Sequence, residues 1–145
     1  ISTKKNTSNP DPPKIEIKIN LLPYKHTSEI QFINPTFSSL YLNETQPKMT
    51  INDKEYNYTP TFNFSSHELP EGNYTIVFTL ENITLNTMES MFLNSTRLDE
   101  INFINFREGN QITSMASAFK NCADFIKINT INATDTDNQT LSYYL

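Results

Sequence analysis

Apolar and polar residues alternate strictly along the segment Lys14-Ile15-Glu16-Ile17-Lys18-Ile19-Asn20. Because successive side chains of a strand point to opposite faces, this alternation predicts a half-buried β-strand with Ile15, Ile17 and Ile19 on its inner face. Residues 1–13, which precede it, are polar and rich in proline and predict a flexible arm or linker. The predicted core therefore begins at this strand.

Short apolar stretches continue the β pattern up to residue 82. Asn-Pro, Gln-Pro, Asn-Asp and Thr-Pro pairs separate them and favour turns. The predicted strands cover residues 29–33, 39–42, 48–51, 55–58, 61–64 and 74–80. The last of them follows Leu69-Pro70-Glu71-Gly72-Asn73-Tyr74, a turn common in immunoglobulin-like sandwiches, where the tyrosine packs at a corner. Residues 14–82 are therefore predicted to form an immunoglobulin-like β-sandwich, in a mainly β (α+β) chain.

From residue 83 the apolar positions follow a repeat of 27 residues. In the first unit, Met88, Met91 and Phe92 have the spacing of one face of a short helix, and a short buried strand follows them. The repeated positions are Leu85, Met88, Met91, Phe92, Asn94, Leu98, Ile101 and Asn102, and then Ile112, Met115, Ala118, Phe119, Asn121, Phe125, Ile128 and Asn129. A fixed period of this length is typical of a solenoid. We expect residues 83–145 to form two such units and a partial third.

The segment Met88 to Phe106 resembles the repeat of BspA-like leucine-rich-repeat surface proteins, which carry a Met-Phe pair, then a Cys, a Leu and a closing Phe. Phe92 and Phe119 match the family phenylalanine, Cys122 matches the cysteine, and Leu98 and Phe125 match the leucine position. Ser95 replaces the cysteine in the first unit, Ala118 replaces a methionine in the second, and only the first unit has the closing Phe106. The resemblance covers about residues 83–131. It implies a solenoid of strands and short helices with a role in adhesion or cell-surface architecture, and it brings no catalytic residues.

Asparagine is unusually frequent, with nineteen residues, and nine of them begin an Asn-x-Ser/Thr sequon for N-glycosylation. The sequons start at Asn6, Asn43, Asn57, Asn63, Asn73, Asn82, Asn94, Asn132 and Asn138. Random pairing with the 30 Ser and Thr residues would give about four. An AT-rich genome would explain part of this excess. We expect several sequons to carry covalent glycans, which places the chain outside a eukaryotic cell or on its surface.

The net charge and the cysteine content bear on which kinds of molecule the chain can bind. The formal net charge is −5, without a run of like charges, which argues against binding to nucleic acid or anionic membranes. No apolar stretch approaches the length of a membrane-spanning helix. The single cysteine, Cys122, is predicted to pack as a small hydrophobe in the repeat, although an intermolecular disulfide is an alternative.

Catalytic and metal-binding patterns are missing from the sequence. The two histidines, His26 and His67, have no ligand partner at a useful spacing, and His67 is expected in an exposed loop. There is no glycine-rich phosphate loop and no nucleophile with a base. We therefore expect neither an enzyme nor a metal or cofactor.

Two functional hypotheses remain. In the first, the chain is a structural surface protein that assembles head to tail into a fibre, through exchange of the strand that carries Ile15, Ile17 and Ile19 and through packing of the repeat end. That strand can equally pair within its own chain. In the second, the chain is a monomeric adhesion or glycan-binding module, for which Tyr56 and Tyr58 offer aromatic rings on one strand face.

Overall fold

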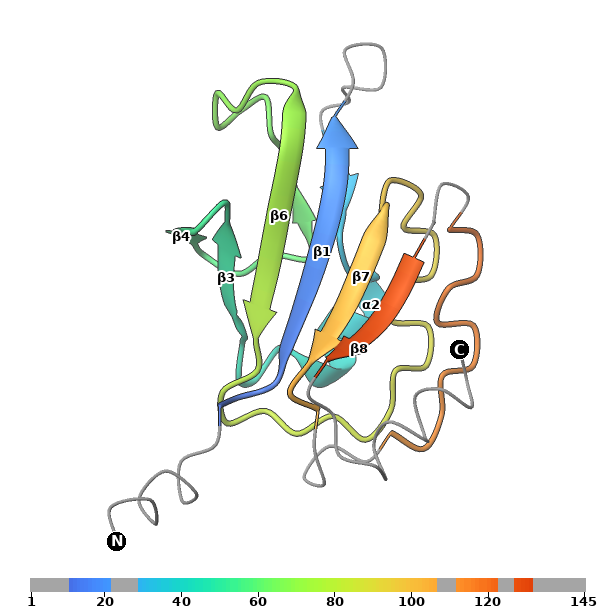
Figure 1. Ribbon diagram of the computed structural model, residues 1–145. Helices are drawn as coiled ribbons and strands as arrows, with labels where there is room; N and C mark the ends of the chain where they lie inside the picture. The colour runs from blue at the N-terminus through green and yellow to red at the C-terminus, as the bar shows by residue number, and fades with distance from the viewer. Residues whose placement is uncertain (1–10, 22–28, 107–111, 123–126, 132–145) are drawn as a thin grey trace, which may run out of the picture.

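A computed structural model describes residues 11–21, 29–106, 112–122 and 127–131. The protein is mainly β, and its large mixed sheet has six strands in the order β4-β3-β6-β1-β7-β8 (Figure 1). These strands are β1 (Lys14–Leu21), β3 (Lys48–Ile51), β4 (Lys54–Tyr56), β6 (Gly72–Thr79), β7 (Glu100–Ile104) and β8 (Lys127–Ile131). A second sheet pairs β2 (Ile30–Gln31) with β5 (Thr61–Phe62).

Strand β1 lies in the middle of the six-stranded sheet and pairs with its own chain on both edges (Figure 1). Ile17 lies opposite Ile76 of β6 on one side and opposite Ile101 of β7 on the other. The predicted alternation is confirmed, because Ile15 and Ile17 are 0% exposed and Ile19 is 2% exposed. In this structure the strand pairs with β6 and β7 of its own chain, which is the alternative to strand exchange between copies.

The prediction of a strand at residues 39–42 is wrong, because residues Pro35–Tyr41 form helix α2. The Asn34 Oδ1 atom accepts hydrogen bonds from the backbone N–H groups of Thr36 (2.9 Å) and Phe37 (3.3 Å), which caps the helix start. Pro35 at the first helical position has its φ angle already set for a helix. The Asn-Pro pair is therefore a cap and first residue, whereas the sequence suggested a turn.

Asparagine takes the backbone conformations that glycine would otherwise adopt. Asn52 and Asp53, with φ of 48° and 69°, form the two-residue connection between β3 and β4. Two positive φ values are what the tight hairpin turn matching strand twist requires. Positive φ also occurs at Asn82, Asn94, Asn105 and Asn121. Part of the asparagine excess thus has a conformational role.

The turn before β6 has the predicted corner interaction. The buried Tyr74 side chain donates its hydroxyl hydrogen to the Pro70 carbonyl oxygen at 2.5 Å, four residues upstream. The layer facing the large sheet, however, consists in the described residues of the β2–β5 pair, α2 and the turns of the repeat. An immunoglobulin-like pair of large sheets is not seen in these residues.

The two repeat units stack in register. Strands β7 and β8 pair in parallel with Ile101 opposite Ile128, and the rings of Phe92 and Phe119 stack at 5.6 Å and 7°. The backbone conformation repeats as well, since positive φ occurs at Ser90 and again at Ser117. We call the two stacked units, residues 83–106 and residues 112–122 with 127–131, the coils. A short helix at Met88–Phe92 is not formed; this prediction is wrong, because the positive φ of Ser90 turns the chain out of a right-handed helix.

The predicted repeat positions pack as follows. Met88, Met91, Phe92, Leu98 and Ile101 are fully buried, and Met115 is buried at 6% exposure. Phe119, Cys122 and Ile128 are partly buried against the same core. Phe125 lies outside the described residues. Because β1 joins β6 to β7, one sheet and one core continue across the expected boundary at residue 83. Most of the predicted arm also lies outside the described residues, but the Pro13 carbonyl accepts a hydrogen bond from the Leu80 N–H.

Asparagine side chains connect the coils to each other and to the first strand. The Asn129 amide donates to Asn102 Oδ1 at 2.7 Å, and the Asn102 amide donates to Glu16 of β1 (2.7 Å) and to Glu100 (3.0 Å). This chain of polar contacts crosses β8, β7 and β1 on the face of the sheet opposite the core. It holds the repeat asparagines at the spacing that the sequence repeat predicts.

Candidate functional site

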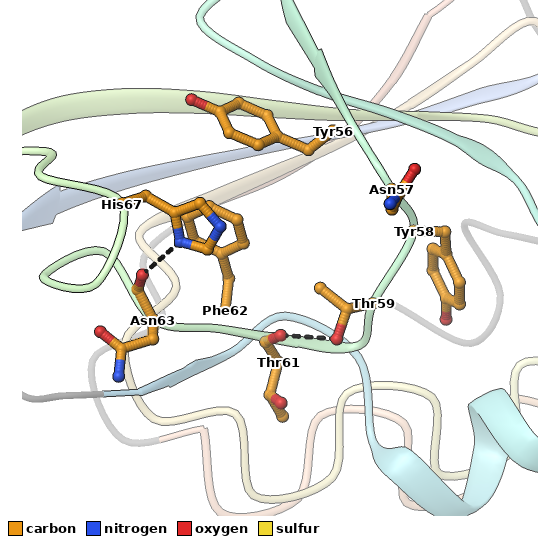
Figure 2. Close-up of a pocket in the computed structure, with 8 residues that line it drawn as sticks. All are labelled: Tyr56, Asn57, Tyr58, Thr59, Thr61, Phe62, Asn63 and His67. Carbon is orange, nitrogen blue, oxygen red and sulfur yellow. Dashed lines mark hydrogen bonds between the residues drawn. The ribbon is translucent and has the colours of Figure 1, made fainter.

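A pocket of about 400 Å³ lies between the end of β4, strand β5 and the turn that follows it (Figure 2). Its lining residues are Tyr56, Asn57, Tyr58, Thr59, Thr61, Phe62, Asn63 and His67. One wall of the pocket is held by a hydrogen bond in which Thr59 Oγ1 donates to the Thr61 carbonyl oxygen at 2.7 Å. The pocket thus combines aromatic rings with amide and hydroxyl groups.

The turn after β5 places His67 over the pocket. Asn63 Oδ1 accepts a hydrogen bond from the Ser66 N–H at 2.9 Å, and the Asn63 carbonyl oxygen lies 2.8 Å from His67 Nδ1. The imidazole stacks on the Phe62 ring, with centroids 4.3 Å apart and an angle of 21°. His67 is exposed, as expected, but its ring is held in place by these contacts.

Tyr56 completes the aromatic wall that His67 and Phe62 begin. Its ring meets Phe62 edge to face at 5.2 Å and His67 at 5.7 Å, so that three rings surround one side of the pocket (Figure 2). Such edge and stacked arrangements are favourable for aromatic pairs. The three rings therefore support one another as a single aromatic surface.

Tyr58 anchors the far end of the pocket to the core. Its hydroxyl lies 2.5 Å from Ser38 Oγ of α2, and its ring contacts Phe78 at 5.8 Å. Burial raises the pKa of the Tyr58 hydroxyl above its usual value, and the Ser38 hydrogen bond offsets part of this rise. Tyr56 and Tyr58, noted in the sequence as a pair, thus have different roles, because one lines the pocket and the other fixes its wall.

Six of the predicted sequons lie in the described residues, and all six present the asparagine at the surface. Asn43, Asn57, Asn73, Asn82 and Asn94 are exposed, and Asn63 is partly exposed. At Asn94 the side-chain oxygen accepts a hydrogen bond from Asn121 at 2.9 Å, which leaves the nitrogen, the atom that carries a glycan, outside this contact. Asn6, Asn132 and Asn138 lie outside the described residues.

Cys122 packs between the coils. Its Sγ atom donates to the Phe92 carbonyl oxygen at 3.0 Å, and the side chain is partly buried against the core. Burial raises the pKa of the Cys122 thiol, and a backbone hydrogen bond from Ser95 lowers it in part. This thiol is therefore a weak nucleophile at neutral pH.

Within the described part of the chain, no cluster of three or more His, Cys, Asp or Glu side chains has an arrangement that could hold a metal ion. None of the helices described there has the length and apolar character needed to cross a membrane.

The sequence indicated only part of this site. Tyr56 and Tyr58 were visible as an aromatic pair, and Asn57 and Asn63 as sequons, but nothing joined them to His67. The stack of His67 on Phe62 depends on the turn at 63–67, for which the Asn63 side chain is the only local signal. In comparisons with known proteins, the chain matches no protein-family model, no curated protein and no solved structure.

Proposed function

We propose that this chain is an extracellular, N-glycosylated surface protein with a structural or adhesive role, in which a β-rich cap carries the coils of a BspA-like leucine-rich-repeat solenoid. The observation that carries the proposal is the surface position of all six sequon asparagines in the described residues. The stacking of two 27-residue coils, with matching side-chain ladders, supports the solenoid part. No catalytic activity, metal or cofactor belongs to this proposal.

The test is expression of the full chain through the secretory pathway of a eukaryotic cell. We expect a secreted product whose mass falls on treatment with an N-glycosidase, and peptide mapping that places glycans on Asn43, Asn57, Asn73, Asn82 or Asn94. A chain retained inside the cell, or a secreted chain with no mass change, would contradict the proposal.

Self-assembly, if the chain forms fibres, is proposed to use the repeat end. Strand β8 is the outermost strand of the described sheet on that side, and Ile131 on it is 40% exposed. Exchange of β1 would remove a strand that is hydrogen-bonded on both edges, which makes it the more costly contact. Head-to-tail contacts of this kind do not close and so give filaments.

Glycan binding is a second candidate function, and the pocket of Figure 2 favours it. Sugars present apolar C–H faces together with hydroxyl and amide groups, and the pocket offers aromatic rings beside Asn57 and Thr59. Titration of the protein with soluble oligosaccharides, followed by NMR of the Tyr56 and His67 rings, would test this function.

A further inference from the structure

We propose that the pocket between β4 and β5 holds the first sugar of this chain's own N-linked glycan, attached at Asn57. The inference rests on the glycosylation that the proposed function includes, and adds a defined ligand and place. Asn57-Tyr58-Thr59 is a sequon, and its asparagine and threonine both line the pocket. The attachment atom and the binding surface are therefore parts of one structure.

The chemistry of the pocket fits N-acetylglucosamine, the sugar that joins an N-linked glycan to asparagine. One face of this sugar is apolar and can lie against an aromatic ring, while its acetamido group donates and accepts hydrogen bonds. Tyr56 and His67 provide the rings, and the Thr59 hydroxyl, which donates to Thr61, still has lone pairs that can accept. The volume of about 400 Å³ has room for one or two sugar residues.

Asn57 is better placed for this role than the second sequon on the pocket. In Figure 2 the Asn63 amide points away from Tyr56 and His67, and its oxygen is held by the Ser66 N–H. Asn57 is exposed and lies across the pocket from His67. A glycan on Asn63 would thus leave the pocket, whereas one on Asn57 begins at its rim.

Covalent attachment also favours the chain's own sugar over a sugar from another molecule. A tethered group reaches an effective concentration in the millimolar range, so a contact whose dissociation constant lies below that range is occupied most of the time. The aromatic wall is already formed, because His67 is fixed on Phe62. Binding of the sugar consequently costs little conformational entropy for ordering the pocket side chains.

The experiment compares the secreted, glycosylated full chain before and after enzymatic trimming. One sample is trimmed by an endoglycosidase to a single N-acetylglucosamine on each asparagine, and a second sample is treated with an amidase that removes the whole glycan and leaves aspartate. We expect loss of this last sugar to lower the melting temperature by roughly 3 °C in the wild type. The same loss is expected in Asn63→Gln, the matched control, but not in Asn57→Gln or in His67→Ala, whose sugar-binding wall is incomplete.

Soluble di-N-acetylchitobiose distinguishes the two sources of sugar. We expect it to shift the Tyr56 ring resonances in Asn57→Gln, where the pocket lacks its tethered sugar, and to leave them unchanged in the glycosylated wild type. Equal binding to both proteins would overturn the proposal in favour of a sugar from another molecule. An equal temperature shift in wild type and His67→Ala would overturn it as well.

Peptide mapping separates failure of this inference from failure of the proposed function. If the other surface sequons carry glycans and Asn57 does not, the inference is wrong and the surface glycoprotein assignment stands. If no sequon carries a glycan, the assignment itself is wrong. His67 is exposed, so its replacement by alanine is expected to leave the fold intact.

Discussion

Burial of the Tyr58 side chain links its titration to the stability of the fold. Burial raises the pKa of its hydroxyl in the folded state above the value of about 10 that an unfolded tyrosine has. Between these two pKa values the unfolded chain has lost its proton and the folded chain has kept it. The free energy of unfolding is therefore at its full value below about pH 10 and falls as the pH rises toward the folded pKa.

Tyr58→Phe is expected to make this alkaline loss of stability smaller. At pH 7 the variant should be less stable by about 1 kcal/mol, because the Ser38 hydroxyl, which is buried, loses its partner. Urea unfolding at pH 7, 10 and 11 measures both effects. Tyr74, whose pKa burial also raises, leaves some alkaline loss in the variant. Parallel pH profiles for wild type and variant would show that Tyr58 does not contribute.

At the scale of elements, Asn34 connects the short helix to the first coil. Its Oδ1 atom caps α2, and its Nδ2 atom donates to the Leu93 carbonyl oxygen at 3.1 Å. Asn34→Ala removes both contacts and is expected to cost about 1–2 kcal/mol of unfolding free energy. Chemical denaturation followed by circular dichroism measures this loss.

Asn34→Ser separates the two contacts. A serine at this position still caps the helix but cannot reach Leu93 with an amide. We expect its stability to lie between that of the wild type and that of Asn34→Ala. If serine and alanine are equally destabilising, the cap contributes nothing and the bond to Leu93 carries the whole effect.

The elements differ in how far the sequence alone determines them. Strand β1 could be predicted because the alternation of Ile15, Ile17 and Ile19 with polar residues has a single structural meaning. Helix α2 could not be predicted in this way, because the pair Asn34-Pro35 is compatible both with a turn and with the capped start of a helix. The turns of the coils were predicted as short helices because Met88, Met91 and Phe92 share one face in either conformation, and the positive φ of Ser90 leaves no mark in the apolar pattern.

The pocket shows a different limit. Its residues lie within one short stretch of sequence, 56–67, but their use depends on the pairing of β4 with β3 and of β5 with β2. These pairings set the distance between Tyr56 and Phe62, and local patterns do not contain it. Sequence reasoning could therefore find the aromatic residues and sequons and not the surface that they form together.

At the scale of the whole molecule, the cap and the coils share one sheet and one core. The buried cluster extends from Ile15 in β1 to Ala118 in the second coil. Because β1 pairs with both β6 and β7, its removal leaves the facing edges of these two strands unpaired together. We infer that the two parts unfold as a single cooperative unit.

Ile17→Asp tests this inference. Ile17 is 0% exposed, and an unpaired carboxylate there is expected to cost about 4 kcal/mol or more, a large share of the roughly 5–15 kcal/mol that stabilise an ordinary domain. Calorimetry should show loss of the whole melting transition rather than of half of it. A folded variant with two separate transitions would show that the cap and the coils are independent.

Ile131→Asp tests the repeat end without disturbing the core, since this side chain is already 40% exposed on the outermost described strand. Leu40→Asp on α2, where the side chain is 69% exposed, is the matched control for adding a charge to an apolar surface position. If filaments of the glycosylated chain form through the repeat end, electron microscopy should show them in the wild type and in Leu40→Asp but not in Ile131→Asp. The melting temperatures of all three proteins should agree, because neither position is buried. Filaments that persist in Ile131→Asp would exclude a contact through this part of β8. Assembly through β1 would then require the strand to leave its own sheet and pair with another copy, because β1 is needed for the fold of the single chain.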